Sequence, residues 1–213
     1  MAFYLVSAVL KQDLSEELER LLRENAFVDL QPFGKVLSHS LRNARIRDDG
    51  FAVWDTLAIA EYLAEKFPAL TLWPAATRER ARARSLCAEM HAGFAALRNH
   101  FPMNIEASLP EVGGRKLVEI PEVGRDVERI GDLWSHQVDA SGGPFLFGGF
   151  GIADAYFAPV CTRFRTYGLP LPDAAAAYAR RILELQAMQQ WDAEARAEKD
   201  FIAFDEPYRQ APS

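Results

Sequence analysis

The clearest pattern in the first third of the chain is an alternation of apolar and charged residues around an Asp-Gly pair. In "RNARIRDDGFAVW", apolar residues such as Ile46 and Val53 take every second position on both sides of Asp49-Gly50. Asp-Gly suits a two-residue hairpin turn, because both of its positions tolerate a positive φ. The pattern predicts an antiparallel hairpin, followed by a helix over about 56–67.

The segments before the hairpin alternate between strand-like and helix-like patterns. The compact apolar run at 3–10 predicts a buried strand. Residues 15–25 carry leucines on one helical stripe, and residues 27–33 read as a second short strand. Residues 1–73 therefore predict a small α/β unit with the order β-α-β-β-β-α.

After residue 76 nearly every segment follows a helical repeat, so an all-α bundle is expected to follow the α/β unit. The stretch "IADAYFAPVCTRF" is apolar almost all round, which predicts a helix at the centre of that bundle. The predicted elements are, in order, one long helix at 77–101, a loop at 102–122, a long helix at 122–139, the central helix from about 152, helices at about 173–186 and 188–199, and a loose tail.

Composition and charge narrow the functional classes. The 213 residues are 49% hydrophobic with a net charge of −6, as in a globular protein that does not bind nucleic acid. The basic run "RERARAR" at 78–84 is interrupted by glutamate and predicts a solvated helix face. Cys87 and Cys161 lie in apolar helical stretches, so neither a disulfide nor a metal site is expected. The start of the chain lacks a basic segment and a membrane-spanning apolar run, so a cytoplasmic protein without a membrane partner is expected.

Several motifs resemble the glutathione S-transferase superfamily. "VWDTLAIAEYLAEKFP" and "LWP" resemble the segment that joins the last strand to the third helix and the linker that follows it. "FGGFGIADAYFAPV" resembles the buried-helix motif of the C-terminal half, and "AEMHAGFAALRNHFPMN" and "TRFRTYGLPL" resemble a bacterial branch of the superfamily. The motifs occur in order and at suitable separations between Asp49 and Trp191, so their combination is more specific than any one of them.

The resemblance implies a remodelled thioredoxin-like, glutathione-binding domain at 1–73 and an all-helical domain at 77–213. It implies that glutathione, as a co-substrate, is conjugated to small hydrophobic electrophiles, or that it supports an isomerisation. It also implies a homodimer and a role in detoxification.

The first 48 residues depart from the superfamily's pattern. "QPFGKVL" at 31–37 resembles the loop in which a cis-proline follows a residue whose backbone pairs with the cysteinyl part of glutathione. The resemblance thus assigns Val36 and Leu37 to glutathione, with Leu37 at the proline position, where a cis bond costs about 2.5–4 kcal/mol. The room for a second helix is also nearly absent. These departures keep a second hypothesis open, a non-catalytic binding or assembly module with an impaired glutathione site.

Asp55 and Thr56 stand where the predicted helix leaves its first amide hydrogens unpaired. One interpretation is a plain helix cap, which stabilises a helix by about 1 kcal/mol. The other is a ligand site, in which Thr56 and the free amides hold a carboxylate while Asp55 pairs with an ammonium group. By the resemblance, that ligand is the γ-glutamyl end of glutathione.

A transferase also needs a group that stabilises the glutathione thiolate. By the resemblance this is a Tyr, Ser or Cys near the start of the first helix, where Ser15 is nearest in position and Ser7 is second. A hydroxyl there donates a hydrogen bond to the thiolate, helped by the helix dipole. Ser15 fits a plain helix cap equally, so both interpretations stay open.

The electrophile is expected between the two halves, against the 77–101 helix. Candidate residues for its wall are His91, Phe94, Arg98, Met103 and Asn104. Their ordinary roles are core packing for Phe94 and Met103, surface exposure for Arg98, and a hydrogen-bonded neutral imidazole for His91.

Asp154 is predicted to have a structural role. It follows Gly151 by three residues, so its carboxylate can accept a hydrogen bond from the N–H at the start of the central helix. Pro159, inside the same helix, predicts a kink.

Overall fold

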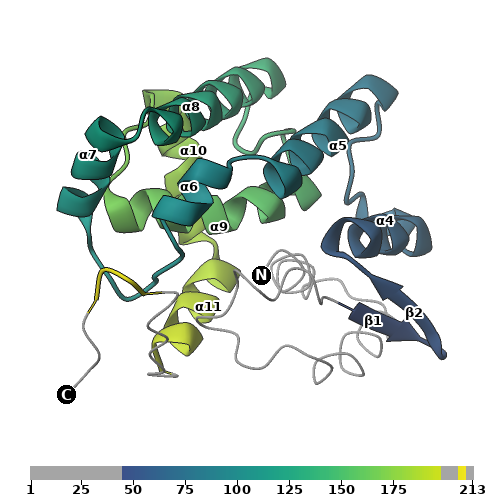
Figure 1. The fold of residues 1–213 in the computed structure, drawn as a ribbon. Coiled ribbons are helices and arrows are strands. Elements are labelled where there is room, and N and C mark those ends of the chain that lie inside the picture. Colours follow the sequence, from purple (N-terminus) through teal and green to yellow (C-terminus); the bar gives the residue numbers. More distant parts are fainter. Residues whose placement is uncertain (1–44, 198–205, 210–213) are drawn as a thin grey trace.

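The structure is a computed structural model that describes residues 45–197 and 206–209 of the chain (Figure 1). In this part, a small antiparallel two-stranded sheet and one helix precede a body of helices. This order confirms the expected plan of an α/β unit followed by an all-helical one. The strands expected at 3–10 and 27–33 and the helix at 15–25 lie outside the described residues, and the boundaries at 73 and 77 stay predictions.

The predicted hairpin is present. Strand β1 (Arg45–Asp48) pairs antiparallel with β2 (Phe51–Trp54), in a register that sets Ile46 opposite Val53. The turn residues Asp49 and Gly50 have φ angles of 46° and 86°, the positive values for which Asp-Gly is suited.

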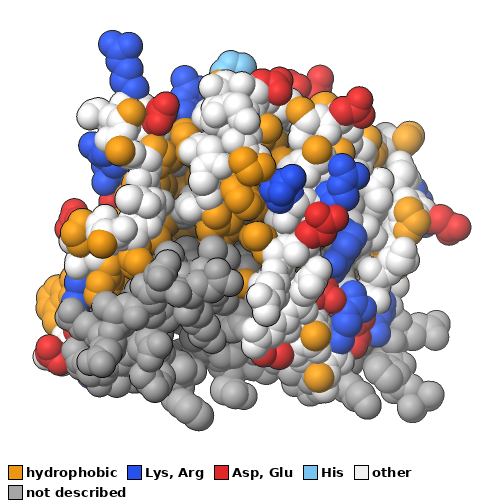
Figure 2. Space-filling model, turned by 180° about the vertical axis from the view of Figure 1, so that it is seen from behind, with side chains coloured by type: hydrophobic (Ala, Val, Ile, Leu, Met, Phe, Trp, Pro, Cys, Tyr) orange, Lys and Arg blue, Asp and Glu red, His pale blue; other side chains and the backbone are white. Residues whose placement is uncertain are grey.

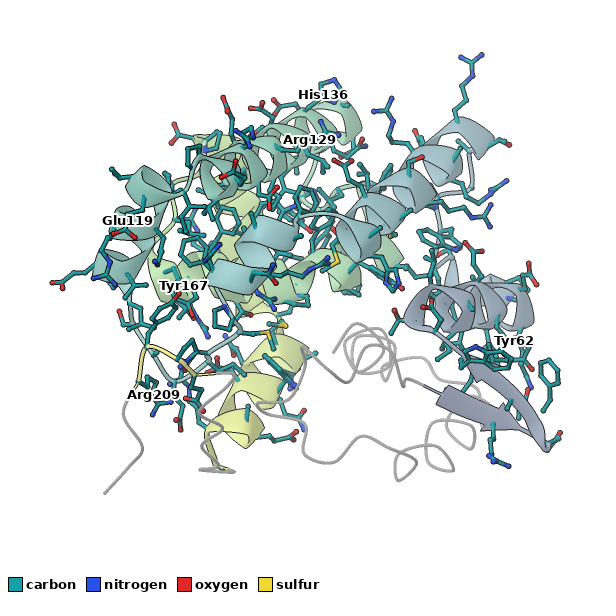
Figure 3. All side chains as sticks on the ribbon, viewed as in Figure 1. Tyr62, Glu119, Arg129, His136, Tyr167 and Arg209 are labelled. Carbon is teal, nitrogen blue, oxygen red and sulfur yellow. The ribbon has the colours of Figure 1, made fainter. Side chains whose placement is uncertain are left out.

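Helix α4 (Thr56–Lys66) lies against the hairpin. The Tyr62 hydroxyl and the Lys66 ammonium group both donate to the carboxylate of Asp48 on β1, and Figure 3 shows Tyr62 on the hairpin side of α4. The short 3-10 helix η1 (Pro68–Leu70) then leads into the linker. The hairpin and α4 therefore form one unit that places the first turn of α4.

The helical body is built around α9. Its elements are α5 (Thr77–Ala92), α6 (Ala95–His100), α7 (Pro110–Glu119), α8 (Pro121–Ser141), α9 (Ile152–Tyr167), α10 (Asp173–Glu184) and α11 (Gln186–Ala197). Every residue of α9 except Arg165 is buried, and the helix contacts α5, α7 and α10, so the prediction of a central buried helix is confirmed. Figure 1 shows α9 running through the middle of the body. Pro159 lies within α9, and the kink stays a prediction.

The prediction of one helix over 77–101 is wrong. The helix ends at Ala92, and Phe94 adopts a left-handed conformation with φ 54° before α6 begins. The Arg98 guanidinium on α6 reaches back and donates to the carbonyls of Met90 and His91, at 2.9 and 3.2 Å. A basic group near the last carbonyls of a helix satisfies acceptors that the helix itself leaves free. Apolar residues keep their helical spacing across Phe94. The sequence pattern therefore gave no sign that the helix ends there.

The prediction of a loop over the whole of 102–122 is also wrong, because α7 occupies part of it. Pro110 sits in the first turn, where a helix needs no N–H donor. A Cβ atom at Gly113 would lie only 1.9 Å from the carbonyl oxygen of Tyr167, so a glycine at this position lets α7 approach α9 closely. Gly113 thus serves helix packing, although glycine is more typical of a loop or turn.

The sequence predicted a loose tail after the last helix. Residues 206–209 are instead packed against the helical body. Glu206 is 2% exposed and accepts a hydrogen bond of 3.2 Å from the Asn104 side chain. The Arg209 guanidinium lies 2.8 Å from the Glu106 carboxylate, and the Tyr208 hydroxyl donates to the His100 carbonyl at 2.9 Å. This short segment is thereby fixed to the body beyond α6.

Three side chains of α9 hold the loop that follows α6. Arg163 Nε donates to the carbonyl of Phe101 at 2.9 Å, the Tyr167 hydroxyl to that of Pro102 at 2.9 Å, and Thr166 to that of Asn104 at 2.8 Å. Each bond is made to a backbone carbonyl. The motif "TRFRTYGLPL" thus fixes the path of the 101–104 backbone.

The described surface carries charges of both signs. Figure 2 shows Lys and Arg side chains interspersed with Asp and Glu on the face turned away from the viewer in Figure 1. Arg78, Arg82 and Arg84 of the basic run are exposed, as predicted. No helix in the described ranges is both long and apolar enough to cross a membrane.

Candidate functional site

The N-terminal end of α4 is built around Asp55. Its backbone carbonyl accepts the first helical hydrogen bond, from Ile59 N at 2.9 Å, and its Oδ1 accepts from Leu57 N at 2.8 Å. Its backbone has φ 72° and ψ 133°, a combination unusual for any residue except glycine. Asp55 is therefore a helix cap in a strained conformation.

Thr56 is the first residue of the helix, so the interpretation of Thr56 itself as the cap is wrong. Its side chain is buried, at 8% exposure, and lies beside the Tyr156 hydroxyl of α9. Burial raises the pKa of Tyr156 well above its ordinary value, so this phenol stays protonated. Thr56 thus joins the start of α4 to the central helix.

His91 meets Asp55 across the boundary between the two units. Its Nε2 lies 3.4 Å from Asp55 Oδ2, and the two side chains are 36% and 42% exposed. The imidazole, when protonated, forms an ion pair with this carboxylate. The Oδ2 atom is the oxygen that does not cap the helix, and it lies beside His91 in the last turn of α5.

The other four candidate residues for the electrophile site lie further along the chain. Their side chains are buried or hydrogen-bonded to other parts of the protein. Phe94 and Met103 are buried, at 8% and 6% exposure. Arg98 caps the end of α5, and burial lowers its pKa, although the nearby Asp126 opposes this shift. Asn104 is 4% exposed, and its side-chain oxygen accepts from Ala107 N at 3.2 Å while its amide nitrogen donates to Glu206. Of these five residues, His91 contacts the N-terminal end of α4 in the described structure.

Several glutathione transferases of known structure are similar to this chain. A glutathione transferase homologue from Burkholderia gl BGR1, with bound glutathione, has a TM-score of 0.55 and 25% identity over 81% of this chain and 90% of its own. A glutathione transferase from Methylococcus capsulatus str. Bath has a TM-score of 0.51 and 25% identity over 72% of this chain and 73% of its own. A homologue from Lodderomyces elongisporus, with two GSH per subunit, has a TM-score of 0.54 and 20% identity over 90% of this chain and 93% of its own.

This chain has the glutathione transferase fold. The resemblance deduced from the sequence motifs is therefore confirmed. No protein-family model and no curated protein matches the sequence.

In this glutathione transferase-like chain, Asp154 takes the structural role predicted for it. One carboxylate oxygen accepts from Gly151 N at 2.9 Å and the other from Leu146 N at 3.1 Å. Burial raises the pKa of Asp154 to about 6, although both hydrogen bonds act in the opposite direction. The carboxylate joins the glycine-rich turn at residues 146–151 to the start of α9.

The other residues predicted to contact glutathione or its thiol precede residue 45. Ser7, Ser15, Val36 and Leu37 lie outside the described residues. Cys87 and Cys161 are buried free thiols, and burial raises the pKa of both, so neither supplies a thiolate. Across 45–197 and 206–209, no group of three His, Cys, Asp or Glu side chains is arranged to hold a metal ion.

Sequence reasoning missed the contact between Asp55 and His91. The two residues are 36 positions apart, on elements whose packing decides whether they meet. The available signal was the position of His91, one residue beyond the apolar stripe of its helix. That offset places its side chain at the edge of the packed face.

Proposed function

We propose that this chain binds glutathione at the N-terminal end of α4 and transfers it to small hydrophobic electrophiles. The carboxylate of the γ-glutamyl end is received by amides of the first turn, where the helix dipole favours an anion, with Thr56 beside them. Asp55 Oδ2 pairs with the ligand's ammonium group. Such a reaction suits the detoxification of electrophiles in the cytoplasm.

The strained backbone of Asp55 is the observation that carries this proposal. A plain cap residue has an extended backbone with negative φ, whereas Asp55 has φ 72°. A residue in a sparsely populated region costs of the order of 1–3 kcal/mol, and such strain gathers at ligand sites. The strain supports a ligand role, because capping alone does not require it.

Two of the structurally similar proteins support glutathione as the ligand. The homologues from Burkholderia gl BGR1 and Lodderomyces elongisporus were crystallised with glutathione. The same ligand suits an end of α4 that offers amide donors and one half-exposed carboxylate.

The proposed chemistry is attack by the glutathione sulfur. With an activated aryl halide, a carbon–sulfur bond forms, the carbon–halogen bond breaks, and the halide leaves, while the thiol proton passes to solvent. The hydroxyl of Ser15, or in the alternative Ser7, stabilises the thiolate, and the backbone at Val36 and Leu37 aligns the cysteinyl part. In an isomerisation the same sulfur adds to the substrate and is later eliminated.

His91 is the best-placed member of the proposed electrophile wall, because it stands beside Asp55 at the edge of the space that the ligand would enter. Phe94 and Met103 supply apolar surface around it. Arg98 and Asn104 contribute by fixing the end of α5 and the following loop.

The direct test is retention on immobilised glutathione, followed by a conjugation assay with an activated aryl halide. We expect retention and measurable product. A folded protein that is neither retained nor active would overturn the proposal.

Two substitutions of Asp55 separate ligand binding from capping. Asp55→Asn keeps an excellent cap but removes the charge that pairs with the ammonium group, so we expect affinity for glutathione to fall about tenfold or more. Asp55→Gly relieves the positive φ while losing the cap, so the free energy of unfolding should change by less than about 1 kcal/mol although retention falls.

The matched control is Glu122→Gln, which removes the same charge from the exposed first turn of α8. It should leave retention unchanged. If both Asp55 variants bind glutathione as well as the wild type, Asp55 is only a cap.

A second candidate function is a non-catalytic assembly module. Phe51 and Trp54 on β2 are 64% and 65% exposed, which is unusual for large aromatic residues and typical of a protein contact surface. A normally folded chain that is not retained on immobilised glutathione would favour this module. In either case, we propose that these two exposed residues of the hairpin are covered in a homodimer.

A further inference from the structure

Two arginine side chains of the helical body are held without an acidic partner among the described residues. Arg163 on α9 is 6% exposed, and its guanidinium donates to the carbonyls of Phe101 and Pro159, at 2.9 and 3.2 Å. Arg98 on α6 is half buried and donates to two carbonyls in the last turn of α5. Every one of these acceptors is a backbone group without formal charge.

The two guanidinium groups are neighbours. Arg163 binds the backbone of Phe101, the C-terminal cap of α6, and Arg98 lies in the last turn of the same helix. Figure 1 shows α6 beside α9. Burial, together with the nearby positive charge of Arg98, lowers the pKa of Arg163 to about 10. Both groups stay cationic at neutral pH, so the protein encloses two like charges.

The acidic side chain that acts on Arg98 does not neutralise it. Asp126 on α8 opposes the fall in the pKa of Arg98 but forms no ion pair with it, and its Oδ2 accepts from Leu97 N at 2.9 Å. Within 45–197 and 206–209, no carboxylate forms an ion pair with either arginine. Buried charges in proteins are normally paired, so two enclosed cations indicate a place for an anion that the described chain does not itself supply.

Arg98 is the member of the pair that a ligand can reach, because Arg163 is almost fully enclosed. Arg98 Nη1 donates to the carbonyl of His91 at 3.2 Å, and the imidazole of His91 lies 3.4 Å from Asp55 Oδ2. A single residue, His91, thus connects Arg98 to the proposed glutathione site. Arg163 adds positive charge from a buried position, where water screens it weakly.

We propose that the electrophile used by this chain carries a carboxylate, which binds Arg98 while the reactive carbon faces the glutathione sulfur. This inference rests on the proposed function and names its substrate class. The Nε and Nη2 atoms of Arg98 make no hydrogen bond in the described part of the chain. Their N–H groups lie side by side on the guanidinium, which is the geometry that a carboxylate accepts with both oxygens. Phe94 and Met103 provide apolar surface for the rest of the molecule.

Paired substrates that differ in charge test the proposal. 4-(Chloromethyl)benzoate carries the carboxylate, and 4-(chloromethyl)benzamide is its uncharged counterpart. With each, a carbon–sulfur bond forms at the benzylic carbon, the carbon–chlorine bond breaks, chloride leaves, and the thiol proton passes to solvent. After division by the uncatalysed rate with glutathione, we expect kcat/KM for the benzoate to exceed that for the benzamide about tenfold or more.

Arg98→Gln should remove this preference. Glutamine keeps an amide that can donate to the carbonyls of α5 but has no charge, so the ratio of the two kcat/KM values should fall toward one. Both values are measured on one preparation, so a partial loss of folded protein lowers them equally. Arg180→Gln removes the same charge from an exposed position on α10 and should leave the ratio unchanged.

Binding of an unreactive analogue separates this inference from the transferase activity. 4-Ethylbenzoate has no leaving group, and equilibrium dialysis in the presence of glutathione compares its affinity with that of 4-ethylbenzamide. We expect the wild type to prefer the benzoate and Arg98→Gln to lose this preference. That result without turnover would support the carboxylate site while the transferase proposal fails.

The opposite results would refute the inference alone. They are equal affinities of the wild type for the two ethyl compounds, equal normalised turnover of the two chloromethyl compounds, or a preference for the benzoate that persists in Arg98→Gln.

Discussion

Asp55 and Asp154 show how two aspartates at the starts of helices take different roles. The Asp154 side chain is buried, and each of its oxygens accepts a backbone N–H. Asp55 is half exposed, and only one of its oxygens is used by the helix. The remaining oxygen, together with the strained backbone, makes Asp55 the residue suited to a ligand.

The raised pKa of Asp154 predicts an unusual dependence of stability on pH. The pKa is about 6 in the folded protein, against 3.8 for an ordinary aspartate. A carboxyl group whose pKa rises on folding stabilises the fold below its unfolded pKa, and this contribution is lost as the pH rises through the folded pKa. At 1.36 kcal/mol per pKa unit, the loss is about 3 kcal/mol.

Asp154→Asn should remove this dependence. The stability advantage of the wild type over the variant, measured by urea unfolding, should shrink by about 3 kcal/mol between pH 3 and pH 7. Asp173→Asn, at the exposed first turn of α10, serves as the control and should show no such trend. An advantage that grows with pH would contradict the assignment.

At the scale of elements, the contact between α7 and α9 depends on a single glycine. Gly113 is buried against the Tyr167 carbonyl, whereas the adjacent Gly114 is exposed and has no atom near the position of a Cβ. Two neighbouring glycines of one helix therefore have different functions.

Alanine substitutions at these two positions should have opposite effects. Gly113→Ala forces the helices apart and should lower the free energy of unfolding by about 1–3 kcal/mol or more. Gly114→Ala should raise it by about 0.5–1 kcal/mol, because alanine favours a helix and meets no obstacle. Chemical denaturation of both variants would measure this, and equal effects would exclude the close approach as the reason for Gly113.

The elements that could be predicted from the sequence were those with a local cause. The hairpin follows from Asp49-Gly50, and the central helix follows from an apolar run that leaves one exposed residue, Arg165. The break at Phe94 was missed because the apolar stripe continues across it. Helix α7 was missed because Gly113 is needed for close packing against Tyr167 of α9, which is far along the chain.

Less of the candidate site could be predicted, because most of its contacts join segments that are distant in the sequence. Asp55 could be recognised as a cap or ligand group from its place before a helix. Its partnership with His91, and the commitment of Asn104 to Glu206, depend on how distant segments pack. Neither leaves a periodic signal in the sequence.

At the scale of the whole molecule, the exposed aromatic residues of the hairpin favour an assembly. Phe51 and Trp54 are both exposed, on opposite faces of β2, and a two-fold pairing that encloses the hairpin would cover both.

Sedimentation of the Phe51→Ala, Trp54→Ala double variant tests the assembly. We expect the wild type to sediment as a dimer and the double variant to shift toward the monomer. Val118→Ala changes another exposed hydrophobic residue, on α7, and should leave the dimer intact. A wild type that sediments as a monomer would rule out the homodimer.

The three donors of α9 that hold the backbone after α6 have a consequence for how this protein can change. Arg163, Thr166 and Tyr167 bind carbonyl groups, which every residue type carries, so the loop's shape does not depend on which side chains it displays. Met103 can therefore be exchanged while the main chain keeps its path. A substitution at this position, in evolution or by design, can thus change the side chain that the loop presents without changing the backbone that carries it.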